Sequence, residues 1–271
     1  MKPSAIRPIL SVFSILAMFT SLESQIPNSG LRIKISDSRC MTFGDAQCPK
    51  HDARSTNPEP RKSWIPLFEG ESTAGWRSAC GSSFPGTGWV IREGALTVLA
   101  ADKPDGPRGG DIVTLERFSD FDLRFEFRIT EGANSGVKYF VQENLPNAQG
   151  AAIGLEYQIL DDDRNEDAVA GKNGNHSNAS LYDLIPARGK QNRPVGEWNS
   201  ARILVRGGHI EHWLNGSKVV RCERASAEFR RLVSESKYRI YPGFGEWEDG
   251  HILLQDHGGE VSFRNMRIRR L

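Results

Sequence analysis

Apolar and polar residues alternate along many short segments of this chain, and this period of two is the feature that most restricts its fold. The alternation is clear in FDLRFEFRIT, residues 121–130, and in GLEYQILD, residues 154–161. Successive side chains of a strand point to opposite faces of its sheet, so these segments predict strands with one buried face. Other segments with this pattern are GWVIREGALTVLA, SGVKYFVQ, NSARILVRGGHIEHWLNGSKVVRCE, GHILLQDHG and EVSFRNMRIR.

Turn dipeptides separate these segments. Glu93-Gly94, Gly207-Gly208 and Asn215-Gly216 are typical of tight hairpins. The last residues, GHILLQDHGGEVSFRNMRIRRL, are interpreted as two strands joined by a Gly-Gly turn. Only a short piece near residues 225–233 has a helical pattern. The sequence therefore predicts an all-β domain, an antiparallel β-sandwich.

The N-terminal residues have the composition of an export signal. Lys2 and Arg7 precede an apolar run from Ile9 to Phe19, after which the chain turns polar. That run is too short to cross a bilayer of about 30 Å, so we expect no stable membrane span. We predict a signal peptide at residues 1–24, a polar linker at 25–62 and one β-sandwich domain at 63–271. The protein is then exported to the periplasm, the cell surface or the extracellular space.

The charge balance argues against a nucleic-acid partner. Lys and Arg number 35 against 34 Asp and Glu, and no basic patch interleaved with aromatic residues is present. The basic end RNMRIRRL is interpreted as the solvated face of a final strand. The sequence does not indicate an oligomeric state.

Two features of the sequence could hold a metal ion or form disulfide bonds. The four cysteines, Cys40, Cys48, Cys80 and Cys222, permit disulfides in an exported chain but lack zinc-ligand spacing. The acidic loop at residues 161–167 could hold Ca²⁺, yet it lacks the spacing of an EF-hand and is better interpreted as a solvated loop. No cofactor is indicated with certainty, and a divalent metal ion stays an open alternative.

Strand parity predicts a shared polar surface. Polar side chains occupy the positions opposite the apolar ones in three segments, and these are Lys138, Glu156, Gln158, Gln255 and His257. If the three strands are neighbours, these side chains line one concave surface. Parity places His212 with apolar Ile210 and Leu214 instead, so we expect it at the edge of that surface or reached through a bulge.

The segments NSGVKYFV, GLEYQILDD, ASLYDLIPA, GEWNSARILVRGGHIEHWLNGSKVV and GHILLQDHGGEVSFRNMRIRRL together resemble the 3-keto-disaccharide hydrolase family. The resemblance covers about residues 63–271. It implies a concanavalin-like jelly roll with its site on the concave sheet, and cleavage of glycosides whose sugar carries a ketone at C3. The family's motifs are polar at seven positions of this chain: Lys138, Glu156, Gln158, His212, Gln255, Asp256 and His257.

A C3 ketone makes the C2 proton acidic, so a modest base can remove it and the C1 substituent can leave by β-elimination before water adds. This reaction needs a base, an acid and an oxyanion stabiliser. The expected catalytic residues are His257, His212 and Glu156. Lys138 or a bound metal could stabilise the enolate, and Lys138, Gln158, Gln255 and Asp256 are the expected substrate contacts.

Two other classes of function stay open at the sequence level. The domain could be a carbohydrate-binding module that uses the same sheet and exposed tryptophans such as Trp213 or Trp247. It could also be a surface scaffold. A binding module needs no proton-transfer pair, so measuring turnover separates the two.

Overall fold

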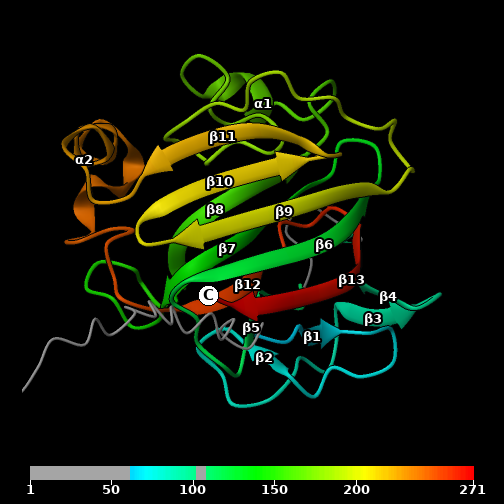
Figure 1. Ribbon diagram of the computed structural model, residues 1–271. Coiled ribbons are helices and arrows are strands. Elements are labelled where there is room, and N and C mark those ends of the chain that lie inside the picture. The colour runs from blue at the N-terminus through cyan, green and yellow to red at the C-terminus, as the bar shows by residue number, and fades with distance from the viewer. Residues whose placement is uncertain (1–61, 102–107) are drawn as a thin grey trace, which may run out of the picture. The chain divides into compact units, whose positions relative to one another are not determined.

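The computed structural model describes residues 62–101 and 108–271 (Figure 1). These residues belong to the compact unit Asn57–Leu271. The predicted signal peptide and all of the predicted linker except Lys62 lie outside the described residues, so both stay predictions. Within the described ranges, no helix is long and apolar enough to span a membrane.

Two antiparallel sheets build the domain, as the alternating pattern predicts. The larger sheet has eight strands, in the order β11 (Ser217–Glu223), β10 (His209–Leu214), β9 (Asn199–Arg206), β6 (Phe121–Ile129), β13 (Val261–Arg270), β4 (Ala95–Val98) and β3 (Trp89–Arg92), with β1 (Ile65–Phe68) also paired to β13. The smaller sheet has five strands, in the order β2 (Trp76–Ser78), β5 (Ile112–Thr114), β12 (His251–Leu254), β7 (Asn134–Gln142) and β8 (Ile153–Leu160).

Aromatic side chains fill the space between the two sheets. Phe121 of β6 meets Tyr139 of β7 edge to face, with ring centroids 6.0 Å apart. Phe125 packs on Tyr157 of β8 in the same way at 5.7 Å. The odd-numbered residues of β6 are buried, whereas Arg124 and its even-numbered neighbours point away from the core. The predicted fold class, an antiparallel β-sandwich, is confirmed.

The three predicted hairpins are present. Glu93-Gly94 joins β3 to β4, Gly207-Gly208 joins β9 to β10, and Asn215-Gly216 joins β10 to β11. All six turn residues have positive φ, as a type I′ turn requires.

The C-terminal segment differs from the simplest interpretation of its sequence. Strand β12 belongs to the five-stranded sheet and β13 to the eight-stranded sheet, so the turn at Gly258-Gly259 carries the chain from one layer to the other. The two strands are not hairpin partners, because Ile252 and Leu254 must face the core from the opposite side to Val261 and Phe263.

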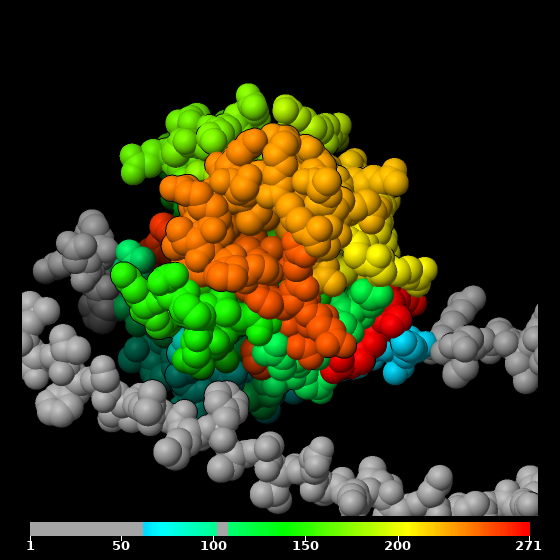
Figure 2. Space-filling view, turned by 90° about the vertical axis from the view of Figure 1, so that its left-hand side faces the viewer, coloured from blue at the N-terminus to red at the C-terminus, as the bar shows by residue number. Residues whose placement is uncertain are grey.

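Three short helical segments complete the described part of the fold: α1 (Asp167–Ala170), α2 (Ala227–Ser234) and the 3-10 helix η1 (Lys237–Ile240). The helical piece expected near residues 225–233 is α2, and the Ser226 side chain caps it by accepting from the Phe229 N–H at 3.1 Å. Figure 2 shows α2 and η1 in orange next to the bright green loop that joins β7 to β8. Of the four cysteines, Cys80 and Cys222 carry free thiols, and Cys40 and Cys48 lie outside the described residues.

Candidate active site

The outer face of the five-stranded sheet brings together most of the polar side chains that parity singled out. Lys138 of β7 is the register partner of Glu156 on β8, and Gly136 is the partner of Gln158. The next strand, β12, pairs Leu253 with Lys138. The predicted neighbourhood of these strands is therefore confirmed.

A pocket of about 320 Å³ lies on this face, under η1. Its polar lining consists of Lys138, Glu156 and Gln255 from the sheet and Lys237, Tyr238 and Tyr241 from the η1 segment. We call it the lysine pocket. The sheet supplies a rigid floor, and a separate segment supplies the opposite wall.

Glu156 is the most unusual group in the lysine pocket. The residue is 5% exposed, and its carboxylate makes no hydrogen bond or ion pair with the described residues. Burial raises the pKa of this carboxyl, while the charges of Lys138 and Lys237 act in the opposite direction. A buried carboxylate without a fixed partner is a feature of functional sites rather than of stable cores.

A glycine makes the position of this carboxylate possible. A Cβ atom on Gly136 would lie 2.4 Å from Oε1 of Glu156 and 3.0 Å from its Cδ. The Glu156 side chain therefore lies across the backbone of β7 in space that only glycine leaves free. An isolated glycine inside a strand often marks such a close approach.

Asp111 holds Lys138 at the floor of the pocket. Its Oδ2 is 3.8 Å from the Lys138 Nζ, and its Oδ1 accepts the backbone N–H of Asp256 at 2.9 Å. Burial raises the pKa of Asp111, and the charge of Lys138 opposes that rise. The site thus contains two desolvated carboxyl groups around one ammonium group.

Lys237 on η1 is the second cation of the pocket. Its backbone N–H donates to Oδ2 of Asp183 at 2.8 Å, and the other oxygen of that carboxylate is 3.1 Å from His176 Nε2. The His176 Nδ1 in turn lies 2.8 Å from Asp167 Oδ1. These contacts tie η1 to the loop that follows β8. Desolvation lowers the pKa of Lys237, whereas Glu156 raises it.

His257 opens onto a second hollow of about 900 Å³ beside the lysine pocket. Its residue is exposed, at the start of the Gly258-Gly259 turn. Burial and the charge of Lys138 have the largest effects on the pKa of Glu156 and of Asp111. The charge of His257 has a smaller effect and lowers both pKa values, so its ring lies within electrostatic range of the two carboxyls. The structure thus brings His257 to the rim of the predicted surface.

His212 is not at this surface. His212 is buried between the two sheets and is 0% exposed. Its Nε2 is 3.0 Å from the Tyr139 hydroxyl, and its Nδ1–H donates to Ala179 O at 3.1 Å. Burial lowers its pKa to about 4. Its parity with Ile210 and Leu214 decided its place, because the register irregularity between His212 and Trp213 in the β10–β11 pair does not turn its side chain out of the core. The expectation that it acts in the site is corrected: it is a neutral core histidine.

Two expected sugar contacts also have structural roles. The Asp256 carboxylate accepts the backbone N–H groups of Gly110 at 2.9 Å and Gly258 at 3.1 Å, which fixes the loops around the site. Gln158 is on the predicted face but only 1% exposed, and its amide nitrogen is 3.4 Å from both Asn134 Oδ1 and Asp167 Oδ2. These hydrogen bonds give both residues a part in supporting the site, and their contact with substrate stays a prediction.

The acidic loop uses its carboxylates to fix its own shape. Asp161 accepts the backbone N–H groups of Gly132 and Asp163, and Asp162 is 2.6 Å from the Lys190 Nζ. In residues 62–101 and 108–271, no group of three or more His, Cys, Asp or Glu side chains is arranged to hold a metal ion.

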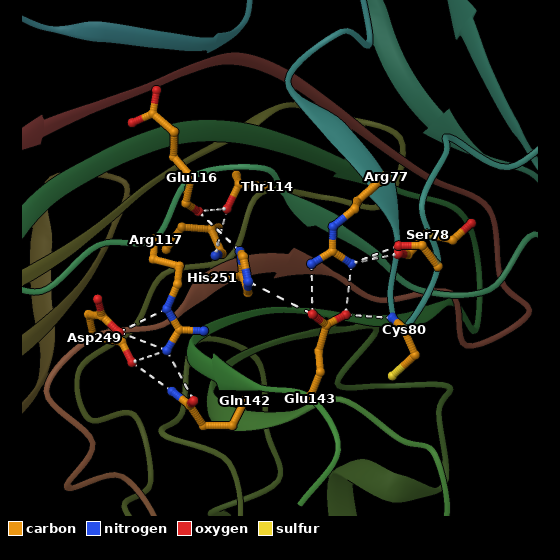
Figure 3. A network of polar contacts seen from close by, with 12 residues as sticks. Arg77, Ser78, Cys80, Thr114, Glu116, Arg117, Gln142, Glu143, Asp249 and His251 are labelled. Carbon is orange, nitrogen blue, oxygen red and sulfur yellow. Dashed lines mark hydrogen bonds and ion pairs between the residues drawn. The ribbon is translucent and has the colours of Figure 1, made fainter.

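The far end of the same face is closed by a network of charged groups (Figure 3). Arg77 makes a two-pronged pair with Glu143, at 2.9 and 2.7 Å, and the Glu143 carboxylate is 3.8 Å from His251 Nε2. Arg117 binds Asp249 beside them at 2.7 Å. These charges satisfy one another, in contrast to Glu156, so the network closes this end of the sheet.

Sequence reasoning missed Asp111, Gly136 and Lys237. A signal existed for Gly136, since it interrupts the otherwise regular strand NSGVKYFVQ. Asp111 immediately precedes β5, but only the pairing of β5 with β12 shows that it faces the site. No sequence pattern predicts that Lys237 lies in the pocket, because η1 is far along the chain from β7 and β8 and only the tertiary fold brings it there.

Comparison with known proteins assigns the family. The sequence matches the 3-keto-alpha-glucoside-1,2-lyase-like domain family over residues 63–269. A 3-keto-disaccharide hydrolase of Bacteroides thetaiotaomicron is 32% identical over an alignment of 233 residues. The match covers 78% of this chain and 80% of the relative.

Solved structures agree with this assignment. A candidate glycosyl hydrolase of Parabacteroides distasonis is 30% identical and superposes with a TM-score of 0.67, covering 77% of this chain and 94% of that one. A second candidate glycosyl hydrolase from the same organism is 25% identical, with a TM-score of 0.54 over 77% of this chain and all of that one. The chain therefore belongs to the 3-keto-alpha-glucoside-1,2-lyase-like domain family, a family of carbohydrate-acting enzymes of the hydrolase and lyase type.

Proposed function

We propose that this enzyme cleaves 3-keto-glycosides, including 3-keto-disaccharides, by removing the C2 proton, eliminating the C1 substituent and then adding water. The family and the Bacteroides relative supply the substrate class. The observation that carries the mechanism is the buried, unpaired carboxyl of Glu156 between two lysines.

Glu156 is the proposed base. A carboxylate that has lost its water and has no fixed hydrogen-bond donor is more basic than one in solution, which agrees with its raised pKa. When Glu156 takes the C2 proton, the C–H electron pair forms a C2–C3 double bond and the negative charge moves to the C3 oxygen.

Lys138 and Lys237 are the proposed stabilisers of that oxygen. They approach the pocket from opposite walls, and both interact electrostatically with Glu156. A fixed cation at the position where negative charge develops lowers the barrier most in a dry site. Asp111 keeps Lys138 in place from below.

His257 is the proposed donor of the proton to the leaving group. As the C3 carbonyl re-forms, the C1–C2 double bond forms and the C1–O bond breaks, so the departing oxygen needs a proton. Water then adds to C1 and gives its proton to His257. C2 regains a proton from Glu156, whose carboxyl has by then exchanged its proton with solvent. The net result is hydrolysis. Gln255 lines the same pocket and is the proposed contact for a sugar hydroxyl.

The positions of the two tryptophans argue against the alternative of a carbohydrate-binding module that uses this face. Trp213 lies on β10, in the other sheet, and Trp247 packs edge to face on Phe244 at 5.8 Å. Neither lines the lysine pocket.

The proposal has a direct test in deuterium oxide. The protein is incubated with a 3-keto-glucoside and with its unoxidised parent, and the products are analysed by mass spectrometry. We expect release of the aglycone from the keto substrate alone, with one deuterium at C2 of the sugar product. Cleavage of both compounds, or cleavage without deuterium, contradicts the mechanism, and binding without cleavage favours the module.

The role of His257 is tested by His257→Ala. We expect a loss of about 10²- to 10⁴-fold in turnover of a keto-glucoside with a poor leaving group, because general acids contribute that much. A substrate whose leaving group needs no proton, such as a nitrophenolate, should lose much less. Equal losses for both substrates would remove His257 from the acid role. The melting curve serves as the control, since an exposed truncation changes stability by about 0.5 kcal/mol or less.

Export of the enzyme also remains a proposal, supported by the charged and apolar pattern of residues 1–24. N-terminal sequencing of the protein from its native host tests it. A mature chain that begins after Phe19 in a non-cytoplasmic fraction is expected, and an intact Met1 in the cytoplasm would refute it.

A further inference from the structure

The outer face of the eight-stranded sheet carries an ordered row of cations that the proposed chemistry does not use. Register pairs Arg267 of β13 with Arg124 of β6, Arg124 with Arg202 of β9, Arg202 with Trp213 of β10, and Trp213 with Lys218 of β11. We call these five residues the cationic row. They cross five strands that lie side by side in Figure 1, a span of about 20 Å at ordinary strand spacing.

Repulsion between the cations of this row opposes folding. Like charges directly opposite one another on neighbouring strands are destabilising, and here three arginines are adjacent. The negative charge of Asp122, which lies beneath the arginines, offsets part of this repulsion. The Asp122 side chain is 0% exposed, and its carboxylate binds Arg202 at 2.7 Å, Arg269 at 3.1 Å and Arg124 at 3.3 Å. Burial opposes its ionisation, yet the hydrogen bonds from Arg202 and Arg124 hold its pKa below the usual range.

The surface keeps an excess of cations after these pairs are formed. Glu211 binds Lys218 at 2.8 Å, and Glu126 binds Arg264 at 2.7 Å. Arg267 is exposed and forms no ion pair within the described part of the chain. One carboxylate, Asp122, therefore faces three guanidinium groups, whereas the chain as a whole has a net charge of only +1.

Four members of the row, Arg267, Arg124, Arg202 and Trp213, line a groove of about 820 Å³. The acidic residues of its lining are Glu69 and Glu126. Trp213 is fixed at its edge, because its indole N–H donates to Glu211 at 2.8 Å. Trp64 supports the other end, with the guanidinium groups of Arg124 and Arg267 at 5.0 and 5.2 Å from its ring centroid. Ser200 and Asn265 add neutral hydrogen-bonding groups to the lining.

Guanidinium groups beside a tryptophan suit a sugar that carries an anion. Arginine binds carboxylates and sulfates through two parallel hydrogen bonds. The Trp213 ring adds an amphipathic surface beside them, and its centroid lies 5.6 Å from the Arg202 guanidinium and 5.5 Å from the Lys218 ammonium. We propose that this groove is a second carbohydrate site, on the opposite face from the lysine pocket, that binds an acidic polysaccharide bearing uronate carboxylates or sulfate esters.

The test uses polygalacturonate, dextran sulfate and neutral dextran as probes in affinity electrophoresis of the native protein, at low and moderate salt. Retardation by at least one of the two anionic polymers, with none by neutral dextran, is expected. The polymer that retards the protein more identifies the anion, carboxylate or sulfate. Equal retardation by neutral dextran would overturn the charge argument, and preferential binding of a short DNA duplex would overturn the assignment to a polysaccharide.

Arg267→Glu is the decisive variant, because this arginine has no ion pair whose loss would disturb the fold. We expect affinity for the polymer to fall about tenfold or more, the effect of about one charge-assisted contact. Arg239→Glu makes the same charge change on η1, outside the groove, and should leave binding nearly unchanged. Equal losses in both variants would indicate attraction by net charge alone, and no loss in Arg267→Glu would remove the groove as the site. Turnover of a soluble keto-glucoside should be normal in Arg267→Glu.

Discussion

Glu156 and Glu211 lie on the outer faces of the two sheets with similar burial, 5% and 8% exposed, yet their surroundings are opposite. Glu156 has no hydrogen-bond donor among the described residues, and burial raises its pKa. Glu211 is buried too, but hydrogen bonds from Lys218, Trp213 and His209 lower its pKa to about 2.

The difference shows that burial alone does not create a reactive group. Glu211 is locked by three fixed donors at 2.8 to 3.2 Å, so its charge stabilises the fold. Glu156 has two lysines within electrostatic range but no bond to either, so its charge is available to a substrate. One sheet uses its outer carboxylate for structure, and we assign the other to chemistry.

The largest expected effect comes from Glu156→Gln. Turnover should fall by about 10²- to 10⁴-fold, because the amide cannot accept the C2 proton. The raised pKa means that the charged form destabilises the fold above the unfolded value of about 4.3, so the neutral variant should melt at the same or a higher temperature near pH 7. A folded variant with normal turnover, measured on a 3-keto-glucoside, would remove the contrast between the two glutamates.

A buried histidine in the core between the two sheets should make the stability of the protein depend strongly on pH below about 6.5. His212 has a folded pKa of about 4 against about 6.5 in the unfolded chain, so the unfolded state binds more protons in that range. The free energy of unfolding should decrease by about 3 kcal/mol as pH falls from about 6.5 to about 4. Urea unfolding at several pH values measures this loss.

His212→Asn is the matched variant for that experiment. Its amide can still donate to Ala179 O, but it does not titrate. The variant should be less stable at pH 7 and show a flatter pH dependence below pH 6.5. An unchanged slope would assign the acid sensitivity to the outer carboxylates instead.

Gly136→Ala sharpens the description of the lysine pocket. The added Cβ must displace the mobile end of the Glu156 side chain rather than any backbone atom, so stability should change little. We expect turnover to fall about tenfold, since small displacements of a catalytic group have large effects on rate. Gly154→Ala is not a usable control, because its Cβ would lie 2.7 Å from the Tyr139 backbone oxygen. A fall in melting temperature without a fall in turnover would contradict the prediction.

The smallest effect is expected on the other sheet, from Glu211→Gln. Its depressed pKa stabilises the fold above the unfolded value of about 4.3, and this contribution disappears as pH falls towards about 2. After screening by solvent we expect a loss of about 1 kcal/mol at pH 7. Turnover should stay within about twofold of normal, since changes away from a site have small effects. A large loss of turnover would show that the two faces are coupled.

The sequence predicted the faces of individual strands well. Parity placed Lys138, Glu156 and Gln158 on one side of their strands and His212 on the other, and each side chain lies as its parity requires. It could not distinguish a polar group that contacts ligand from one that holds a loop. It predicts Asp256 and Gln158 as substrate contacts, and the structure adds that both also hydrogen-bond to Gly110, Asn134 and their neighbours.

The sequence by itself determined the all-β class, the hairpin turns and the family, because alternation and turn dipeptides are local and the family's motifs are contiguous. Tertiary structure decided which strands share a sheet, so it alone separated β12 from β13 and set Asp111 beside Lys138. It also brought Lys237 over Glu156 from 81 positions further along the chain. Desolvation depends on all the atoms around a group, and for this reason no local pattern could tell the unpaired Glu156 from the locked Glu211.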